Sequence, residues 1–156
     1  MSLETVTVEH LPASHKVHVA LFRDVRNAAF LHQQLLGRNP DFEYAFIDAS
    51  VIADAYRRYG ISPSTKDLIV IKVTFPADNG AESLTHDQVW EHLKANVEGE
   101  ASPVTDEQIA TTSDVAKVRK YYKLNGLKWL DEIKDDNIRQ REMESLVISA
   151  MALRGV

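Results

Sequence analysis

The chain contains no cysteine and no long run of apolar residues. The absence of cysteine excludes disulfide bonds and thiolate chemistry, and it points to a reducing compartment. Because no apolar run approaches the length of a membrane span, we expect no membrane segment. The first residues, MSLETVTVEHL, have neither a basic region nor a continuous apolar region, so we do not expect a signal peptide.

The sequence also lacks the motifs that most often indicate a catalytic function. It has no phosphate loop of the Walker type, no G-x-G-x-x-G fingerprint and no G-x-S-x-G elbow. None of its six histidines is paired at the helical spacing of a zinc site. Four carboxylates lie between residues 131 and 136, but no apolar pocket surrounds them to separate their pKa values, so they are typical of a solvated turn. We therefore predict a binding or assembly protein, not an enzyme, with no cofactor and no metal.

The 156 residues are enough for a single domain spanning residues 1–156 with its own core. Alternating residues at 5–9 and 16–22 predict a hairpin, and 42–47 predicts a short strand. The best strand is 67–75, whose centre from Leu68 to Ile71 is continuously apolar, as expected for a strand covered on both faces. We predict an α/β fold with a small mixed, largely antiparallel sheet flanked by helices.

The helices are predicted from their caps and stops. Asp24, Asp48, Thr85, Thr105 and either Ser113 or Asp114 are candidate N-caps, and Thr85 with Gln88 has the spacing of a capping box. We expect the inner face of the first helix to include Ala29 and Leu36, and Gly37 to end it. The predicted helices span about residues 24–36, 50–59, 85–97, 105–110, 114–124 and 137–154.

The last helix is the most informative element. Its first half is charged, and its second half carries an apolar stripe at helical spacing, formed by Met143, Leu146, Val147, Ala150 and Leu153. Ile148 and Met151 add apolar surface away from the centre of this stripe. A docked core helix could account for the whole pattern, and the alternative adds a protein partner on the surplus apolar face. Our candidates for the partner contact are Val147, Ile148 and Met151.

A second helix is basic. Between Val115 and Lys128 there is no acidic residue, and two tyrosines are interleaved with the basic ones. Basic side chains can contact phosphates and aromatic rings can stack on bases, although the net charge of −5 argues against indiscriminate nucleic-acid binding. The alternative is a solvated basic face with Tyr121 and Tyr122 in the core. The candidate RNA-binding residues are Lys117, Arg119, Lys120 and Lys123.

Five stretches occur along the chain in a distinctive order: ALFRDVRNA (20–28), AFID (45–48), IADAYRRYGI (52–61), VRKYYKL (118–124) and LVISAMALRGV (146–156). No single stretch is diagnostic, but in this order they resemble one family, and the resemblance covers nearly the whole chain. That family is the small non-catalytic subunit of the KEOPS (EKC) complex, known in humans as the PRPK-binding protein, and the order and the ending LRGV are similar to fungal members.

The resemblance implies a sheet flanked by helices and an auxiliary role in making threonylcarbamoyl-adenosine in tRNA. It implies direct binding to the N-lobe of the complex's kinase/ATPase subunit, regulation of that subunit and indirect contact with the rest of the complex. It further implies a part in holding tRNA at its 3′ CCA end, a location in nucleus and cytoplasm, and a link to telomeres and transcription. The alternatives are a generic interaction adaptor with no RNA role and, last, an enzyme acting on a small metabolite.

The chain departs from the family at one point. Members of the family have roughly forty residues, including a helix, a basic segment and a strand, between the counterparts of AFID and IADAY, whereas here only Ala49, Ser50 and Val51 lie between Asp48 and Ile52. We expect the helix at 50–59 to persist. Loss of a strand should leave unpaired backbone groups in the sheet, and residues 67–75 would be prone to aggregation if they became an edge.

Overall fold

The computed structural model of the chain describes residues 3–51, 60–76 and 83–153, in which a five-stranded sheet is the central element. The long strand β2 pairs along one side with β4, and β3 follows β4. Along its other side β2 pairs first with β1 and then with β5. Every pairing is antiparallel, which confirms the predicted sheet, and the strands are β1 (Leu3–Val6), β2 (Lys16–Arg23), β3 (Ala45–Asp48), β4 (Leu68–Thr74) and β5 (Glu100–Ser102).

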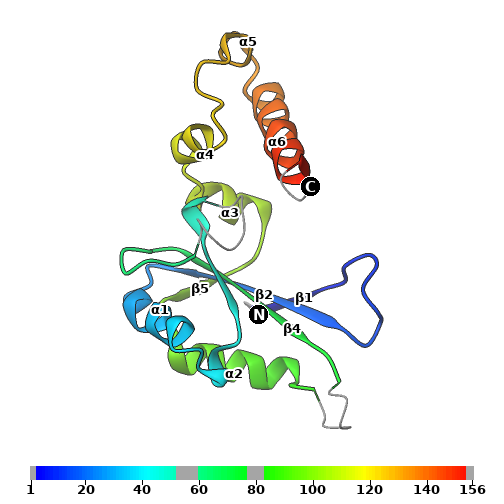
Figure 1. The fold of residues 1–156 in the computed structure, drawn as a ribbon, viewed down its shortest axis with the longest axis vertical. Helices are drawn as coiled ribbons and strands as arrows, with labels where there is room; N and C mark the ends of the chain where they lie inside the picture. The colour runs from blue at the N-terminus through cyan, green and yellow to red at the C-terminus, as the bar shows by residue number, and fades with distance from the viewer. Residues whose placement is uncertain (1–2, 52–59, 77–82, 154–156) are drawn as a thin grey trace.

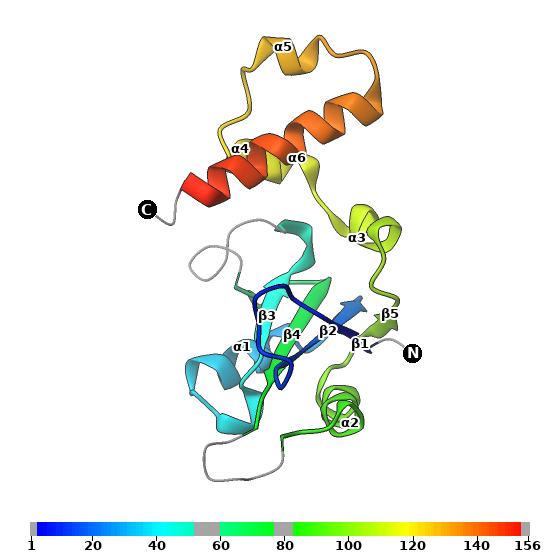
Figure 2. The ribbon, with the colours of Figure 1, turned by 90° about the vertical axis from the view of Figure 1, so that its right-hand side faces the viewer.

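Helices lie on both sides of this sheet, as Figures 1 and 2 show. Two of them, α1 (Ala28–Leu36) and α2 (His86–Asn96), cover one face. The other four follow one another along the chain and extend away from the opposite face. They are α3 (Asp106–Thr112), α4 (Val115–Tyr121), α5 (Lys128–Asp131) and α6 (Asp136–Ala152), and two short 3₁₀ turns, η1 (Pro40–Phe42) and η2 (Ala49–Val51), flank β3.

The core has one layer on each face of the sheet because successive strand side chains point to opposite faces. Leu68 and Val70 of β4 join the larger cluster under α1 and α2, together with Leu31 and Leu93. Ile69, between them, joins a smaller cluster on the other face, against which Ile109 of α3 packs. The continuous apolar centre of β4 is thus explained, and its predicted burial on both faces is confirmed.

Aggregation of residues 67–75 was expected only if they became a sheet edge, and this condition is not met. β4 pairs with β2 on one side and with β3 on the other, so its backbone groups are satisfied in both directions. The edge is β3, where Ile47 forms an isolated antiparallel bridge with Gly60. The sheet therefore has no gap beside β4, and the argument that this strand should drive aggregation loses its basis.

Some of the predicted N-cap residues cap their helices in the structure and others do not. Thr85 and Gln88 form a complete capping box at the start of α2, and the side chains of Thr105 and Asp114 cap α3 and α4. Asp24 does not cap α1, which begins four residues later, because the chain there turns through a positive φ of 50° and the Val25 amide donates to the Lys66 carbonyl instead. Gly37 ends α1 as predicted.

Other differences follow from tertiary contacts. Ala29 and Leu36, predicted on the inner face of α1, are exposed. β5 was not among the predicted strands, and it forms because β2 offers it an unpaired edge beyond β1. In the expected acidic turn, Asp131 is the last residue of α5 and Asp136 is the first residue of α6. The helix predicted at 50–59 falls mostly on residues 52–59, outside the described residues.

Candidate interaction surfaces

α6 packs through its predicted apolar stripe, but it does so against neighbouring helices and not against the sheet clusters. Met143, Leu146, Val147 and Ala150 pack around the buried Tyr122 and Leu124, which follow α4. Leu153, the last predicted member of the stripe, is exposed, so that part of the prediction is wrong. The helix thus belongs to a small helical core on the side of the sheet away from α1 and α2 (Figure 2), and many of its described side chains are exposed.

The three candidate contact residues differ in position. Ile148 is 64% exposed, which is unusual for so large an apolar side chain near the middle of a helix. Val147 is half-buried and belongs to the helical cluster. Met151 lies in α6, but its side chain is outside the described part of the structure. Ile148 is therefore the residue on which the partner prediction can be tested without damaging packing.

A groove of about 740 Å³ separates α6 from α3 and α4. One wall is formed by Ile109, Ala110 and Val115, and the facing wall by Met143, Val147 and Ile148. Charged side chains line it as well: Asp106, Asp136, Glu144 and Arg139. Arg139 is paired with Asp136, so the charge that remains at the groove is mainly acidic.

The four basic candidates are also not equivalent. The Arg119 guanidinium makes a 2.6 Å ion pair with Asp131 of α5, and Lys117 lies 3.7 Å from the carboxylate of Asp114. Arg119 therefore joins α4 to α5, whereas Lys117 pairs with the N-cap residue of its own helix. Lys120 and Lys123 are exposed and form no ion pair within the described ranges. They are the better placed pair for contacting phosphates.

The positions of Tyr121 and Tyr122 agree with the alternative prediction, in which the tyrosines belong to the core and the basic side chains are solvated. Tyr122 is buried and Tyr121 is half-buried in the helical cluster with Val118. Their rings lie 6.4 Å apart and contribute to the packing of α6. Tyr122 is thus a core residue. The surface of α4 can contact phosphates through its lysines more readily than it can stack on bases through its tyrosines.

Acidic residues of the predicted turn have structural roles that the sequence did not suggest. Asp135 accepts hydrogen bonds from the amides of Asn137 and Ile138 and so caps α6, while Asp131 receives Arg119. No group of three or more candidate metal ligands occurs in the part of the chain that the structure describes. The same residues contain no helix long and apolar enough to cross a membrane.

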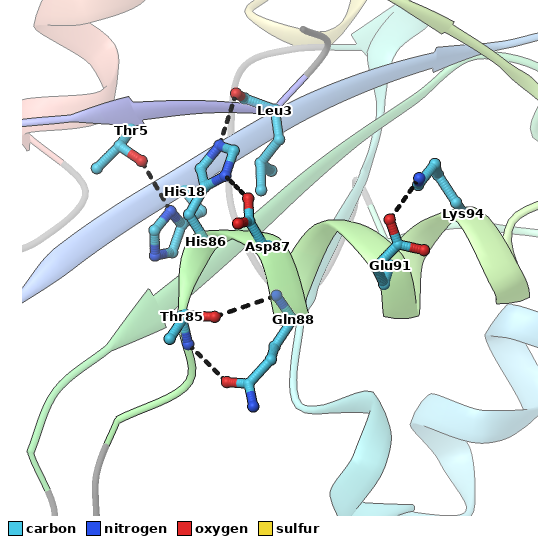
Figure 3. A network of polar contacts seen from close by, with 9 residues as sticks. All are labelled: Leu3, Thr5, His18, Thr85, His86, Asp87, Gln88, Glu91 and Lys94. Carbon is cyan, nitrogen blue, oxygen red and sulfur yellow. Dashed lines mark hydrogen bonds and ion pairs between the residues drawn. The ribbon is translucent and has the colours of Figure 1, made fainter.

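A pair of histidines joins β1, β2 and α2 (Figure 3). His18 is 1% exposed, and its two ring nitrogens are hydrogen-bonded to the hydroxyls of Thr5 and Thr74. His86 lies with its ring 5.8 Å from that of His18 and donates to the Leu3 carbonyl and to Asp87. The sequence analysis missed this pair; the inward position of His18 in an alternating strand was the available signal.

The two histidines have opposite pKa shifts. Burial lowers the pKa of His18 below its ordinary value of 6.5, and the nearby charges of His86 and Lys16 lower it further. The hydrogen bond to the Leu3 carbonyl, followed by the bond to Asp87, raises the pKa of His86. The fold therefore favours a neutral His18 and a charged His86.

We expect the free energy of unfolding to pass through a maximum near neutral pH because of this pair. The contribution of His18 is present above its unfolded pKa of 6.5 and is lost as the pH falls through its lower folded value, whereas the contribution of His86 is lost as the pH rises through its raised folded value. Urea unfolding between about pH 5 and 8 measures both limbs.

Two variants show which histidine produces the acidic limb and which the alkaline limb of the pH dependence of the free energy of unfolding. His18→Gln can keep a hydrogen bond to a threonine but cannot take up a proton, so it should flatten the acidic limb alone. His86→Gln should flatten the alkaline limb and also weaken the acidic one, because it removes a charge that helps to lower the pKa of His18. An acidic limb that is equally steep in the His18→Gln variant would contradict the assignment.

Comparison with known proteins supplies a family. The family described as "Kinase binding protein CGI-121" matches residues 22–55 and 50–155 of the chain. The chain is 62% identical to "EKC/KEOPS complex subunit CGI121" of Gibberella zeae, covering all of both proteins. It is 40% identical to "EKC/KEOPS complex subunit cgi121" of Neurospora crassa, again over both full lengths, and 24% identical to the protein of the same name in Schizosaccharomyces pombe, with 90% and 94% covered.

The comparison also confirms that an internal segment is missing. The alignment with the Gibberella zeae protein runs over 197 positions, whereas the chain has 156 residues, which leaves 41 positions with no residue of this chain. The family match is broken into two parts that meet at residues 50–55, the place where the sequence departs from the family. The missing segment therefore belongs next to η2.

Proposed function

Because the chain belongs to the family of kinase-binding proteins described as CGI-121, we propose that it is a non-catalytic subunit of an EKC/KEOPS complex that binds and regulates the complex's kinase/ATPase subunit. The observation that carries the proposal is the open apolar side of α6. Ile148 is exposed there, in the second half of α6, whereas Met143, Leu146, Val147 and Ala150 of the same helix are packed in the helical cluster. Buried apolar anchors of this kind supply most of the energy of protein interfaces.

Co-purification tests this function directly. The full chain, tagged and expressed in a fungal host, should recover the kinase subunit and, with it, the remaining KEOPS subunits, as identified by mass spectrometry. The matched control is the same tag on an unrelated α/β protein of similar size and charge. Recovery of the chain without the kinase subunit, at equal expression of both, would contradict the proposal.

The proposal includes a contribution to tRNA threonylcarbamoyl-adenosine modification. The chain would help to hold tRNA near its 3′ CCA end through the predicted residues Lys117, Arg119, Lys120 and Lys123. The exposure of Lys120 and Lys123 supports this role, and the ion pair of Arg119 limits what that residue can add. Such a subunit would act in the nucleus and cytoplasm, with the link to telomeres and transcription that the resemblance implies.

A second candidate is an interaction adaptor with no RNA role. The burial of Tyr122 favours it, because a core tyrosine cannot stack on a base. The two candidates share the contact through α6 and differ only at α4. A tRNA-binding measurement on α4 variants therefore separates them.

A further inference from the structure

One large aromatic side chain lies in solvent next to the basic segment. The indole of Trp129, in α5, is 46% exposed and directly follows the exposed Lys128. Because tryptophan is highly buried on average, an indole that is nearly half exposed calls for an explanation. α5 lies at the end of the molecule farthest from the sheet, so a large ligand can approach it from that side (Figures 1 and 2).

Exposed lysines lie on the turns that lead to Trp129. The Lys123 amide donates to the Lys120 carbonyl at 3.3 Å, which places these two lysines in one turn at the end of α4. A second turn, in which the Lys128 amide donates to the Gly126 carbonyl at 3.0 Å, leads into α5. All three lysines are exposed, and in the part of the chain that the structure describes none of them forms an ion pair.

An ion pair closes this segment on itself. The Arg119 guanidinium lies 2.6 Å from the Asp131 carboxylate, so the two ends of the segment that holds the lysines and the indole are in contact. The same pair neutralises Asp131, the one acidic residue between positions 119 and 131. The segment is therefore compact and positively charged, although the chain as a whole carries a net charge of −5.

This combination favours an unpaired nucleic acid over a protein partner. Lysine is depleted in protein interfaces, since its strongly hydrated ammonium group is costly to bury. Lysines that stay in solvent can instead contact phosphates, and an exposed indole can stack on a base. A double helix keeps its bases stacked on one another, so an indole reaches the face of a base most easily in a single strand.

We propose that Trp129 is a stacking platform for unpaired bases of RNA, next to phosphate contacts made by Lys120, Lys123 and Lys128. This inference rests on the RNA role proposed above and specifies its ligand as a single-stranded segment of a few nucleotides. Trp129 supplies the exposed ring that Tyr122, a core residue, does not. Every base has a face on which an indole can stack, so the contact should tolerate different sequences.

The fluorescence of the indole tests the contact directly, because the chain has only two tryptophans. Trp90 packs against Phe22, with ring centroids 6.0 Å apart, and Trp90→Phe leaves Trp129 as the single reporter. A single-stranded RNA of about ten nucleotides should quench its emission in a saturable manner, since a stacked base gives the excited indole a non-radiative route to the ground state. The same RNA annealed to its complement should quench much less. In the matched control Trp129→Phe, Trp90 is the reporter and its emission should not change.

The affinity for the same single-stranded RNA gives a second measurement. Trp129→Ala should weaken binding about fivefold or more, and Trp129→Phe should restore most of it, because a phenyl ring can also stack. The dependence on salt should stay the same in both variants, since the indole contacts no phosphate. Ile138→Ala, at another exposed apolar residue in α6, is the matched control and should bind as the parent does.

Three results would overturn the stacking contact, and they separate it from the RNA role. If Trp129→Ala binds RNA as the parent does and Trp129 is not quenched, the lysines alone carry the RNA contact. If Trp129→Ala loses the purified kinase subunit at unchanged RNA affinity, the indole belongs to a protein interface. If the parent chain binds neither tRNA nor the oligonucleotide, the RNA role fails as well. The quenching experiment keeps Trp129 itself, so it decides the matter even if Trp129→Ala does not fold.

Discussion

Replacing Ile148 by aspartate should abolish co-purification of the chain with the kinase subunit while leaving the fold intact. The side chain is 64% exposed, so the substitution removes little packing from the free protein. At an interface it would place an unpaired charge in a desolvated apolar contact, which costs about 2 kcal/mol or more, equivalent to roughly 30-fold in affinity. Binding is measured by titrating purified chain against purified kinase subunit.

The matched control is Ile138→Asp, in the same helix and similarly exposed. It should bind the kinase subunit as the parent chain does, and both variants should keep the circular dichroism spectrum of the parent. Val147→Asp is a poorer probe because it would disrupt the cluster with Tyr122 and Leu124. If the Ile148→Asp protein is folded and binds with unchanged affinity, the contact does not depend on this side of α6.

Reversing the charge of Lys120 and Lys123 to glutamate should weaken tRNA binding and flatten its dependence on salt. Each lysine that contacts a phosphate releases a counterion, so the slope of log affinity against log salt should fall by about 1 for each lysine replaced. Adding Lys117→Glu should change the slope less than either of the other two substitutions, since Lys117 already lies beside Asp114 and Ser50. Filter binding to tRNA over a series of salt concentrations gives the slopes.

A control with the same change in net charge separates a local contact from general repulsion. Lys16→Glu with Lys94→Glu alters two exposed lysines of β2 and α2, far along the chain from α4. This control should leave the slope close to that of the parent. Equal slopes in the parent and in the Lys120/Lys123 variant would favour the adaptor without an RNA role.

The sequence predicted those parts of the fold that depend on short-range physics. The capping box of Thr85 and Gln88 and the apolar centre of β4 depend on spacing within a few residues, and both are confirmed. Asp24, like Thr85, is of a residue type that favours the N-cap. It failed as a cap because the Val25 amide is bound by Lys66, a partner that no local pattern could reveal.

At the candidate interaction surfaces, too, local sequence patterns could not reveal partners that are distant in the sequence. Helical spacing identified the packed side of α6 up to Ala150, but it could not show that α6 packs on α4 and α5 instead of the sheet. Counting positive charges selected Arg119 together with its neighbours. Only the folded chain shows that Asp131 neutralises Arg119 and leaves Lys120 and Lys123 exposed.

The hydrogen bonds around Asp48 have a consequence for how this family can evolve. One carboxylate oxygen accepts from the Ser50 amide and the other from the Thr65 hydroxyl, while Ile47 bridges Gly60, so the chain is fastened on both sides of the join. Each doubling in length between two such fixed points adds only about 0.6 kcal/mol of closure entropy. We therefore expect insertions and deletions there to leave the register of β3 and β4 unchanged, so that this junction is a place where natural selection can change the length of the protein.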